Sequence, residues 1–182
     1  MNVDLLNIIQ LDFTLTDSEG NLPLSNDGKH YIIWQFNFRD FNILRDSYAP
    51  DSINWLKNQG INFERNCFEG IDSAYFSELM MHYKLICNNK ITWITFQGAY
   101  DFGYLIKILT RCLLPNLLSE FLSLKEKLFG SNVYDVKYLT RFCSGLYGGL
   151  RRIAVTLQIK REIELSQQAV NYELYESISK SK

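Results

Sequence analysis

Apolar and polar side chains alternate along two segments near the start of the chain, and this pattern predicts two β-strands. In residues 8–16, apolar side chains alternate with Gln10, Asp12 and Thr14, which is the period of a half-buried strand. Residues 31–38 are rich in β-branched and aromatic residues. The turn-forming residues 17–21 lie between these segments. We therefore expect a β-hairpin with a long connecting loop, in which the aromatic run Tyr31, Trp34, Phe36, Phe38 and Phe41 forms core.

The rest of the chain alternates between helical and strand patterns. Asp51 and Gly60 are suited to begin and end a short helix, and Asp72 or Ser73 is suited to cap the next one. The continuous bulk of residues 91–96 predicts a central strand, and 133–136 predict a short one. Further helices are expected over 71–81, 104–113, 116–128, 138–142, 150–157 and 166–177. The order predicts an α/β fold with a mixed sheet, in a single domain over residues 1–182.

Composition narrows the possible partners. The chain is 47% hydrophobic, which is enough for a core, and its net charge is −1. No global basic field is present, so any contact with RNA must be local or assisted by a metal. The four cysteines include no C-x-x-C pair and only two histidines occur, which argues against zinc. We expect buried, reduced thiols.

The sequence shows neither a secretory signal peptide nor a membrane-spanning segment. The first residues lack the basic and apolar regions of a signal peptide. No apolar run approaches the roughly 18 residues of a membrane span. The sequence therefore predicts an intracellular, soluble protein.

Several stretches together resemble the Caf/Pop family of deadenylases, and its plant members most closely. They follow one another in the family's order and at its spacing: NVDLLNIIQ at 2–10, WQFNF at 34–38, YAPDSI at 48–53, GINF at 60–63, TFQGAYDFGYL at 95–105, VYDVK at 133–137 and YGGL at 147–150. One such stretch would be weak evidence, but the whole set in register is specific.

The resemblance implies a fold and a function. Family members are 3′-to-5′ exoribonucleases that shorten poly(A) tails, have a ribonuclease H-like fold and work with scaffold and nuclease subunits of the carbon catabolite repressor–Not complex. The resemblance also implies that the protein is located in the nucleus and the cytoplasm. Their chemistry uses two Mg²⁺ or Mn²⁺ ions held by four acids, with a histidine as base. The first two acids lie on a central strand that precedes the segment matched by residues 2–10, so we expect this chain to lack that strand.

The remaining site positions are matched residue by residue. The third acid corresponds to Asp101, and the family's frequent histidine four residues earlier is Gln97. The later histidine corresponds to Gln167 and the fourth acid to Tyr172. Three of the four metal-binding acids are thus expected to be absent. Asp101 is then either a remnant of the metal site, binding an ion weakly, or the cap of a helix that begins near Phe102.

Other carboxylates are poor substitutes for the missing acids. In the family the first two acids form an Asp-x-Glu motif. Asp17-Ser18-Glu19 matches this motif literally, but it lies in a turn where such residues are ordinarily solvated. Glu173 and Glu176 lie near Tyr172, yet on a helix one residue of offset turns a side chain by roughly 100°. Asp135 belongs to the family pattern without being one of the four acids, and we expect it to make a buried structural hydrogen bond.

Three functional hypotheses follow. The chain is an enzyme, namely a divergent deadenylase that trims poly(A) tails with impaired catalysis; or it is a non-catalytic binding module of the deadenylase complex; or it is the product of a truncated gene or a pseudogene. Upstream genomic sequence that encodes an Asp-x-Glu strand would favour the first.

Overall fold

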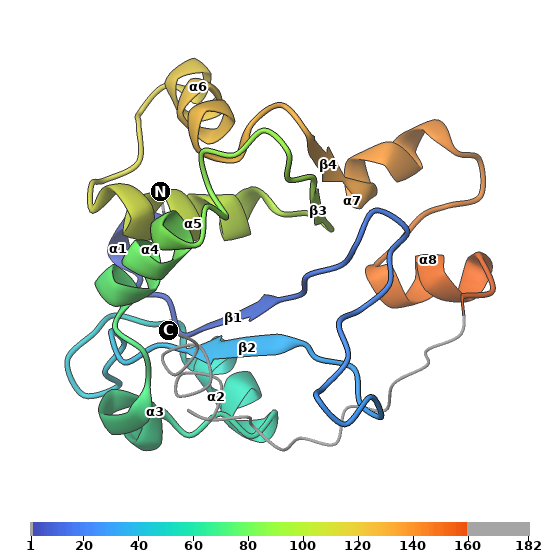
Figure 1. The fold of residues 1–182 in the computed structure, drawn as a ribbon. Coiled ribbons are helices and arrows are strands. Elements are labelled where there is room, and N and C mark those ends of the chain that lie inside the picture. Colours follow the sequence, from blue (N-terminus) through green and yellow to red (C-terminus); the bar gives the residue numbers. More distant parts are fainter. Residues whose placement is uncertain (1, 160–182) are drawn as a thin grey trace.

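The computed structural model describes residues 2–159, which form small paired strands surrounded by helices (Figure 1). In chain order the elements are α1 (Asn2–Leu5), β1 (Gln10–Phe13), β2 (Trp34–Asn37), α2 (Pro50–Asn58), α3 (Phe63–Glu69), α4 (Ser73–His82), β3 (Trp93–Thr95), α5 (Ala99–Thr110), α6 (Leu118–Phe129), β4 (Val133–Asp135), α7 (Val136–Leu139), the 3₁₀ helix η1 (Thr140–Phe142) and α8 (Leu150–Thr156). The helix predicted over 166–177 lies outside the described residues.

The strands form two separate pairs. β1 and β2 are antiparallel, with Gln10 opposite Asn37 and Phe13 opposite Trp34, which confirms the hairpin. β3 and β4 are parallel, with Trp93 opposite Val133. Instead of one mixed sheet, the described residues form one antiparallel pair and one separate parallel pair of strands. β3 was predicted to be central, but within residues 2–159 it pairs only with β4.

One main core joins these pairs to the helices. Helix α5 buries six residues, among them Phe102 and Ile106, and the rings of Trp93, Phe102 and Phe129 contact one another edge to face. Across the gap between the strand pairs, the rings of Phe13 and Trp93 lie 5.8 Å apart. Aromatic contact, and not backbone pairing, thus joins the hairpin to the parallel pair.

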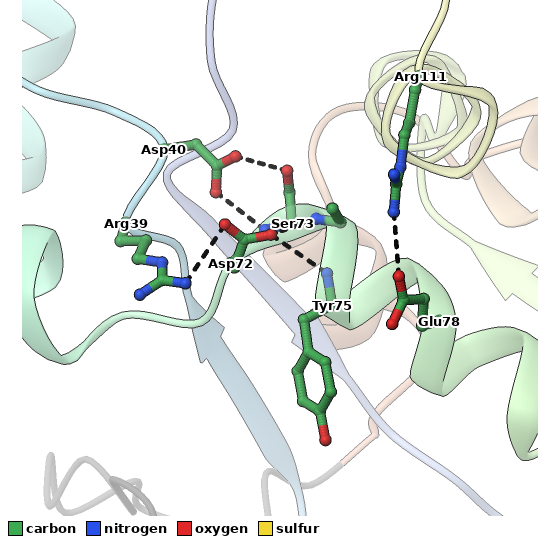
Figure 2. A network of polar contacts seen from close by, with 8 residues as sticks. Arg39, Asp40, Asp72, Ser73, Tyr75, Glu78 and Arg111 are labelled. Carbon is green, nitrogen blue, oxygen red and sulfur yellow. Dashed lines mark hydrogen bonds and ion pairs between the residues drawn. The ribbon is translucent and has the colours of Figure 1, made fainter.

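Helix α4 is held by a network of polar contacts (Figure 2). The Asp72 carboxylate caps it by accepting the N–H groups of Ala74 and Tyr75, as predicted, and it also contacts Arg39. Asp40 accepts both the N–H and the hydroxyl of Ser73. Arg111, just after α5, donates to Glu78 at 3.2 Å. The network fixes α4 against the chain beyond β2 and against α5.

Several expectations are corrected by the structure. Helix α3 was not predicted; Asn62 caps it by accepting the N–H of Arg65. Tyr31 is 55% exposed, although Phe38 and Phe41 of the same aromatic run are buried. The cysteines are free, but Cys87, Cys112 and Cys143 are exposed rather than buried. No helix among the described residues is long and apolar enough to cross a membrane.

Candidate functional site

Asp101 lies where the chain passes from β3 into α5. β3 ends at Thr95, and Gln97 then adopts the left-handed conformation with φ of 63°. A Cβ on Gly98 would lie 2.5 Å from the Thr95 Oγ1, so this turn needs glycine. Gly98 is the N-cap of α5, and Asp101 stands in the first turn. Of the two alternatives for Asp101, the one in which it caps a helix beginning near Phe102 is wrong, because the helix begins at Ala99 and leaves Asp101 inside it.

Asp135 holds this turn in place. Its carboxylate accepts the N–H of Gln97 at 3.0 Å and of Gly98 at 2.9 Å, and it also accepts the N–H of Tyr138, which caps α7. Partial burial would raise the pKa of Asp135, but the backbone donors outweigh it and hold the pKa below its ordinary value. The predicted structural role of Asp135 is confirmed, but its carboxylate is half-buried rather than buried; it joins the turn after β3 to the start of α7.

The electrostatics of Asp101 are opposite to those of Asp135. Although the Asp101 side chain reaches the surface, crowding by protein groups removes part of its hydration and raises its pKa, and the negative charge of Asp135 raises that pKa further. Among residues 2–159, no hydrogen bond to the Asp101 carboxylate lowers this pKa. The site thus combines one carboxylate whose ionised form is stabilised by three backbone N–H groups with one whose pKa is raised.

The structure brings together some of the predicted site residues. Asp101, Gln97 and Asp135 meet where the parallel strands β3 and β4 end. Gln167 and Tyr172 lie outside the described residues, as do Glu173 and Glu176. Within residues 2–159, no group of three or more His, Cys, Asp or Glu side chains is placed to hold a metal ion.

Asp17 and Glu19 behave as turn residues. The Asp17 carboxylate accepts the N–H groups of Glu19 and Asn21, and the N–H of Gly20 donates to the Asp17 carbonyl. Their exposure and these local bonds confirm the turn interpretation.

The contribution of Asp135 to the site was underestimated from the sequence. Residues 91–96 and 133–136 were both predicted as strands, and two parallel strands end at the same edge of a sheet. That rule alone would have placed the Asp135 carboxylate beside the turn that carries Asp101. The left-handed Gln97 gave no such signal, because non-glycine residues seldom adopt positive φ.

Comparisons with known proteins agree on the relationship. No protein-family model matches the chain. It is 48% identical over 160 residues to a probable CCR4-associated factor 1 homolog 10 of Arabidopsis thaliana. It is 42% identical over 160 residues to the poly(A) ribonuclease pop2 of Schizosaccharomyces pombe. Each match spans 88% of this chain.

Solved structures give the same result. The structure of S. pombe Pop2p in its Mg²⁺- and Mn²⁺-bound form matches 88% of this chain with a TM-score of 0.79 and 41% identity, and this chain covers 61% of it. A chain in the structure of the yeast NOT1 MIF4G domain co-crystallized with CAF1 also matches, with a TM-score of 0.70 and 35% identity. The match covers 88% of this chain and 60% of that one. These matches confirm the predicted fold class.

The relatives are longer than this chain. The matched residues make up 57% of the Arabidopsis protein and 46% of the S. pombe ribonuclease. The chain therefore spans about half the length of the curated relatives that it matches.

Proposed function

Because this chain is a homologue of the Caf/Pop proteins over 88% of its length, we propose that it serves in the shortening of mRNA poly(A) tails as a catalytically impaired member. The 42% identity to a protein named as a poly(A) ribonuclease carries the first part of this proposal. The composition of the candidate site supports the second part.

A two-ion site needs several carboxylates that converge on the metals. Asp101 offers one carboxylate, and Asp135 already accepts three backbone N–H groups. Gln97, Gln167 and Tyr172 stand where the resemblance implies histidine, histidine and acid. A glutamine amide does not accept a proton at neutral pH, so it cannot replace a histidine base. These residues do not fit a pair of Mg²⁺ or Mn²⁺ ions, and we propose that the two-ion site is not assembled.

The test is a trimming assay with the 182-residue chain on a 5′-labelled A20 RNA, in Mg²⁺ or in Mn²⁺. The S. pombe Pop2 ribonuclease provides the active control. We expect no shortening above the background of the Asp101→Ala variant. Stepwise 3′ trimming that disappears in Asp101→Ala would overturn the proposed impairment.

A second candidate function is non-catalytic binding to a scaffold subunit. One of the matched structures is that of the NOT1 MIF4G domain co-crystallized with CAF1, and the match covers 88% of this chain. The helical segments predicted over 51–60, 71–81 and 116–128 are present as α2, α4 and α6. We expect the purified chain to be retained by an immobilised NOT1 MIF4G domain. Absence of retention at micromolar concentrations of both proteins would exclude this function.

A further inference from the structure

The two strand pairs turn unpaired edges toward each other. Figure 1 shows β1 and β3 as the inner strands, with β2 and β4 outside them. Within residues 2–159, no backbone hydrogen bond joins β1 to β3. The rings of Phe13 and Trp93, 5.8 Å apart, nevertheless make contact between the two pairs. β1 and β3 are therefore neighbours that do not pair with each other.

The backbone of β1 presents hydrogen-bonding groups on the side that faces away from β2. The N–H of Phe38, just after β2, donates to the carbonyl of Ile9, so the backbone groups of Ile9 point toward β2. Successive residues of a strand point these groups to opposite sides, so those of Gln10 and Asp12 point away from β2. The side chains of Gln10 and Asp12 bond to residues of β2 and do not cover this edge.

β3 has an equivalent edge. Trp93 donates its N–H to the carbonyl of Asn132 beside β4, so the backbone groups of Ile94 point away from β4. Two further polar atoms of this strand, Trp93 Nε1 and Thr95 Oγ1, are buried without a hydrogen-bond partner among the described residues. Buried polar groups in folded proteins are ordinarily paired, so these atoms indicate that β3 lacks a neighbour.

The space between the two edges suits one strand. Paired strands lie about 4.8 Å apart, so two strands that flank a third are separated by about 10 Å. Aromatic side chains on the core face can still meet over that distance, as Phe13 and Trp93 do. Insertion of a second sheet would force these rings apart. The edges are therefore suited to a single extended segment with its apolar face toward the rings.

Residues 170–174 have the pattern of such a segment. They read VNYEL, in which three apolar or aromatic side chains alternate with two polar ones. A strand gathers all three on one face, whereas a helix would turn Tyr172 away from the other two. The helix expected over 166–177 thus has a competing strand pattern inside it.

The intervening chain is long enough for this segment to reach the edges. Ile159 is the last described residue and follows α8. The chain from Ile159 to residue 170 spans up to about 40 Å when extended. A domain of this size has a radius of gyration of about 15 Å. Residues 170–174 can therefore lie beside β1 and β3 of the same chain.

We propose that residues 170–174 add a strand between β1 and β3 and join the two pairs into one mixed sheet. The backbone of this strand hydrogen-bonds to the edge groups of Gln10 and Asp12 on one side and of Ile94 on the other. Its apolar face covers the rings of the core beside Trp93. Such closure also removes two strand edges that would otherwise be open to pairing with other chains. The inference is independent of the proposed function, because it requires neither RNA nor metal.

The test uses nuclear Overhauser contacts in the isotope-labelled full chain. Protons of paired strands lie close together, so contacts are expected between residues 170–174 and both Asp12 and Ile94. Tyr172→Pro removes a backbone donor that a central strand needs, and it should abolish these contacts. It should also lower the melting temperature by about 4–8 °C, the shift for a net loss of about two hydrogen bonds in a chain of this size.

Two matched variants serve as controls. Ser179→Pro places the same residue outside the segment, so it should leave the contacts and the melting temperature unchanged. Tyr172→Val keeps a residue that favours strands and disfavours helices, so it should retain the contacts. Circular dichroism would verify that each variant is folded.

Three outcomes would overturn the proposal. The first is the absence of contacts between residues 170–174 and either edge in the unmodified chain, including the case in which these residues show the contacts of a helix. The second is that a different segment contacts Asp12 and Ile94. The third is that a mixture of labelled and unlabelled protein shows the contacts between chains, since the strand is then supplied by a second copy. The trimming assay bears only on catalytic impairment, so failure of the proposed function leaves this inference unaffected.

Discussion

Helices α5 and α8 differ in how much of themselves they bury. In α5, of 12 residues, Phe102, Gly103, Leu105, Ile106, Ile108 and Leu109 are buried. In α8, of seven residues, only Ile153 is buried. Helix α5 is thus specified by packing on several sides, whereas within residues 2–159 helix α8 buries a single side chain.

Truncating one side chain in each helix tests whether α5 contributes more to stability than α8. Ile106 has no exposed surface, so Ile106→Ala should reduce the free energy of unfolding by about 2–5 kcal/mol. Val155 on α8 is 69% exposed, and Val155→Ala should change the free energy of unfolding by no more than about 0.5 kcal/mol. Urea denaturation followed by circular dichroism measures both values. Equal effects would show that the two helices contribute alike to the core.

Helix α5 also holds the start of the chain through one lysine. Lys107 Nζ donates to the carbonyls of Val3, Asp4 and Leu6 at distances of 2.8–3.1 Å. Lys107→Met leaves these carbonyls without their charged donor and should cost about 1.5–3 kcal/mol of stability. Lys57→Met, at an exposed position of α2, is the control in the same urea titration. An unchanged midpoint for Lys107→Met would mean that water replaces the lysine without penalty.

The start of α5 depends on Asp135, and this dependence should vary with pH. The pKa of Asp135 is lowered in the folded state, so its ionised form adds stability above the unfolded pKa of 3.8, and this stability is lost as pH falls through the folded pKa. Asp135→Asn should therefore lower the free energy of unfolding by about 1 kcal/mol at pH 7, the size of one hydrogen bond, and by less at pH 3. Urea titrations at the two pH values give the difference. A pH-independent loss would show that the charge of Asp135 contributes nothing.

The smallest effect on stability is expected from substitution of Asp101, which should stabilise the fold where substitution of Asp135 destabilises it. Because the folded state raises the pKa of Asp101, this carboxyl lowers stability progressively as the pH rises above its unfolded pKa of 3.8, and the effect is complete above its folded pKa. Asp101→Asn should slightly raise the melting temperature at pH 7 and leave it unchanged below pH 3.8, where the carboxyl is protonated in both states. A lower melting temperature at pH 7 would show that the charge is favourable at the helix N-terminus.

Elements that are marked by a local sequence pattern, such as alternation or a capping residue, were predicted correctly. The alternation in residues 8–16 identified β1, although the strand is shorter, and the Asp72 cap placed the start of α4 correctly. Helix α3 was missed because Phe63 and Asn66 are the buried residues of a short, mixed segment without clear periodicity. The interpretation of β3 as central failed because its apolar bulk does not reveal how many strands lie beside it; Ile94 is 70% exposed.

The candidate site was predicted unevenly for a related reason. Asp101 was located because it follows a strand in a recognisable motif, and the hydrogen-bonding role of Asp135 followed from its place in another. The raised pKa of Asp101 arises from crowding and from Asp135, which lies 34 positions later in the sequence. Such a shift depends on tertiary contacts and is not encoded by either motif alone.

The hydrogen bonds from Gln97 and Gly98 to Asp135 span 38 and 37 residues of chain. Contacts at such separation form only after the entropy of closing the intervening loop has been overcome, so this turn should be ordered late during folding. It should also open together with the start of α7, because the same carboxylate holds both. The amide protons of Gln97, Gly98 and Tyr138 should then exchange with solvent deuterium at a common rate set by one opening event, while those of Ile106 and its neighbours in α5 exchange far more slowly.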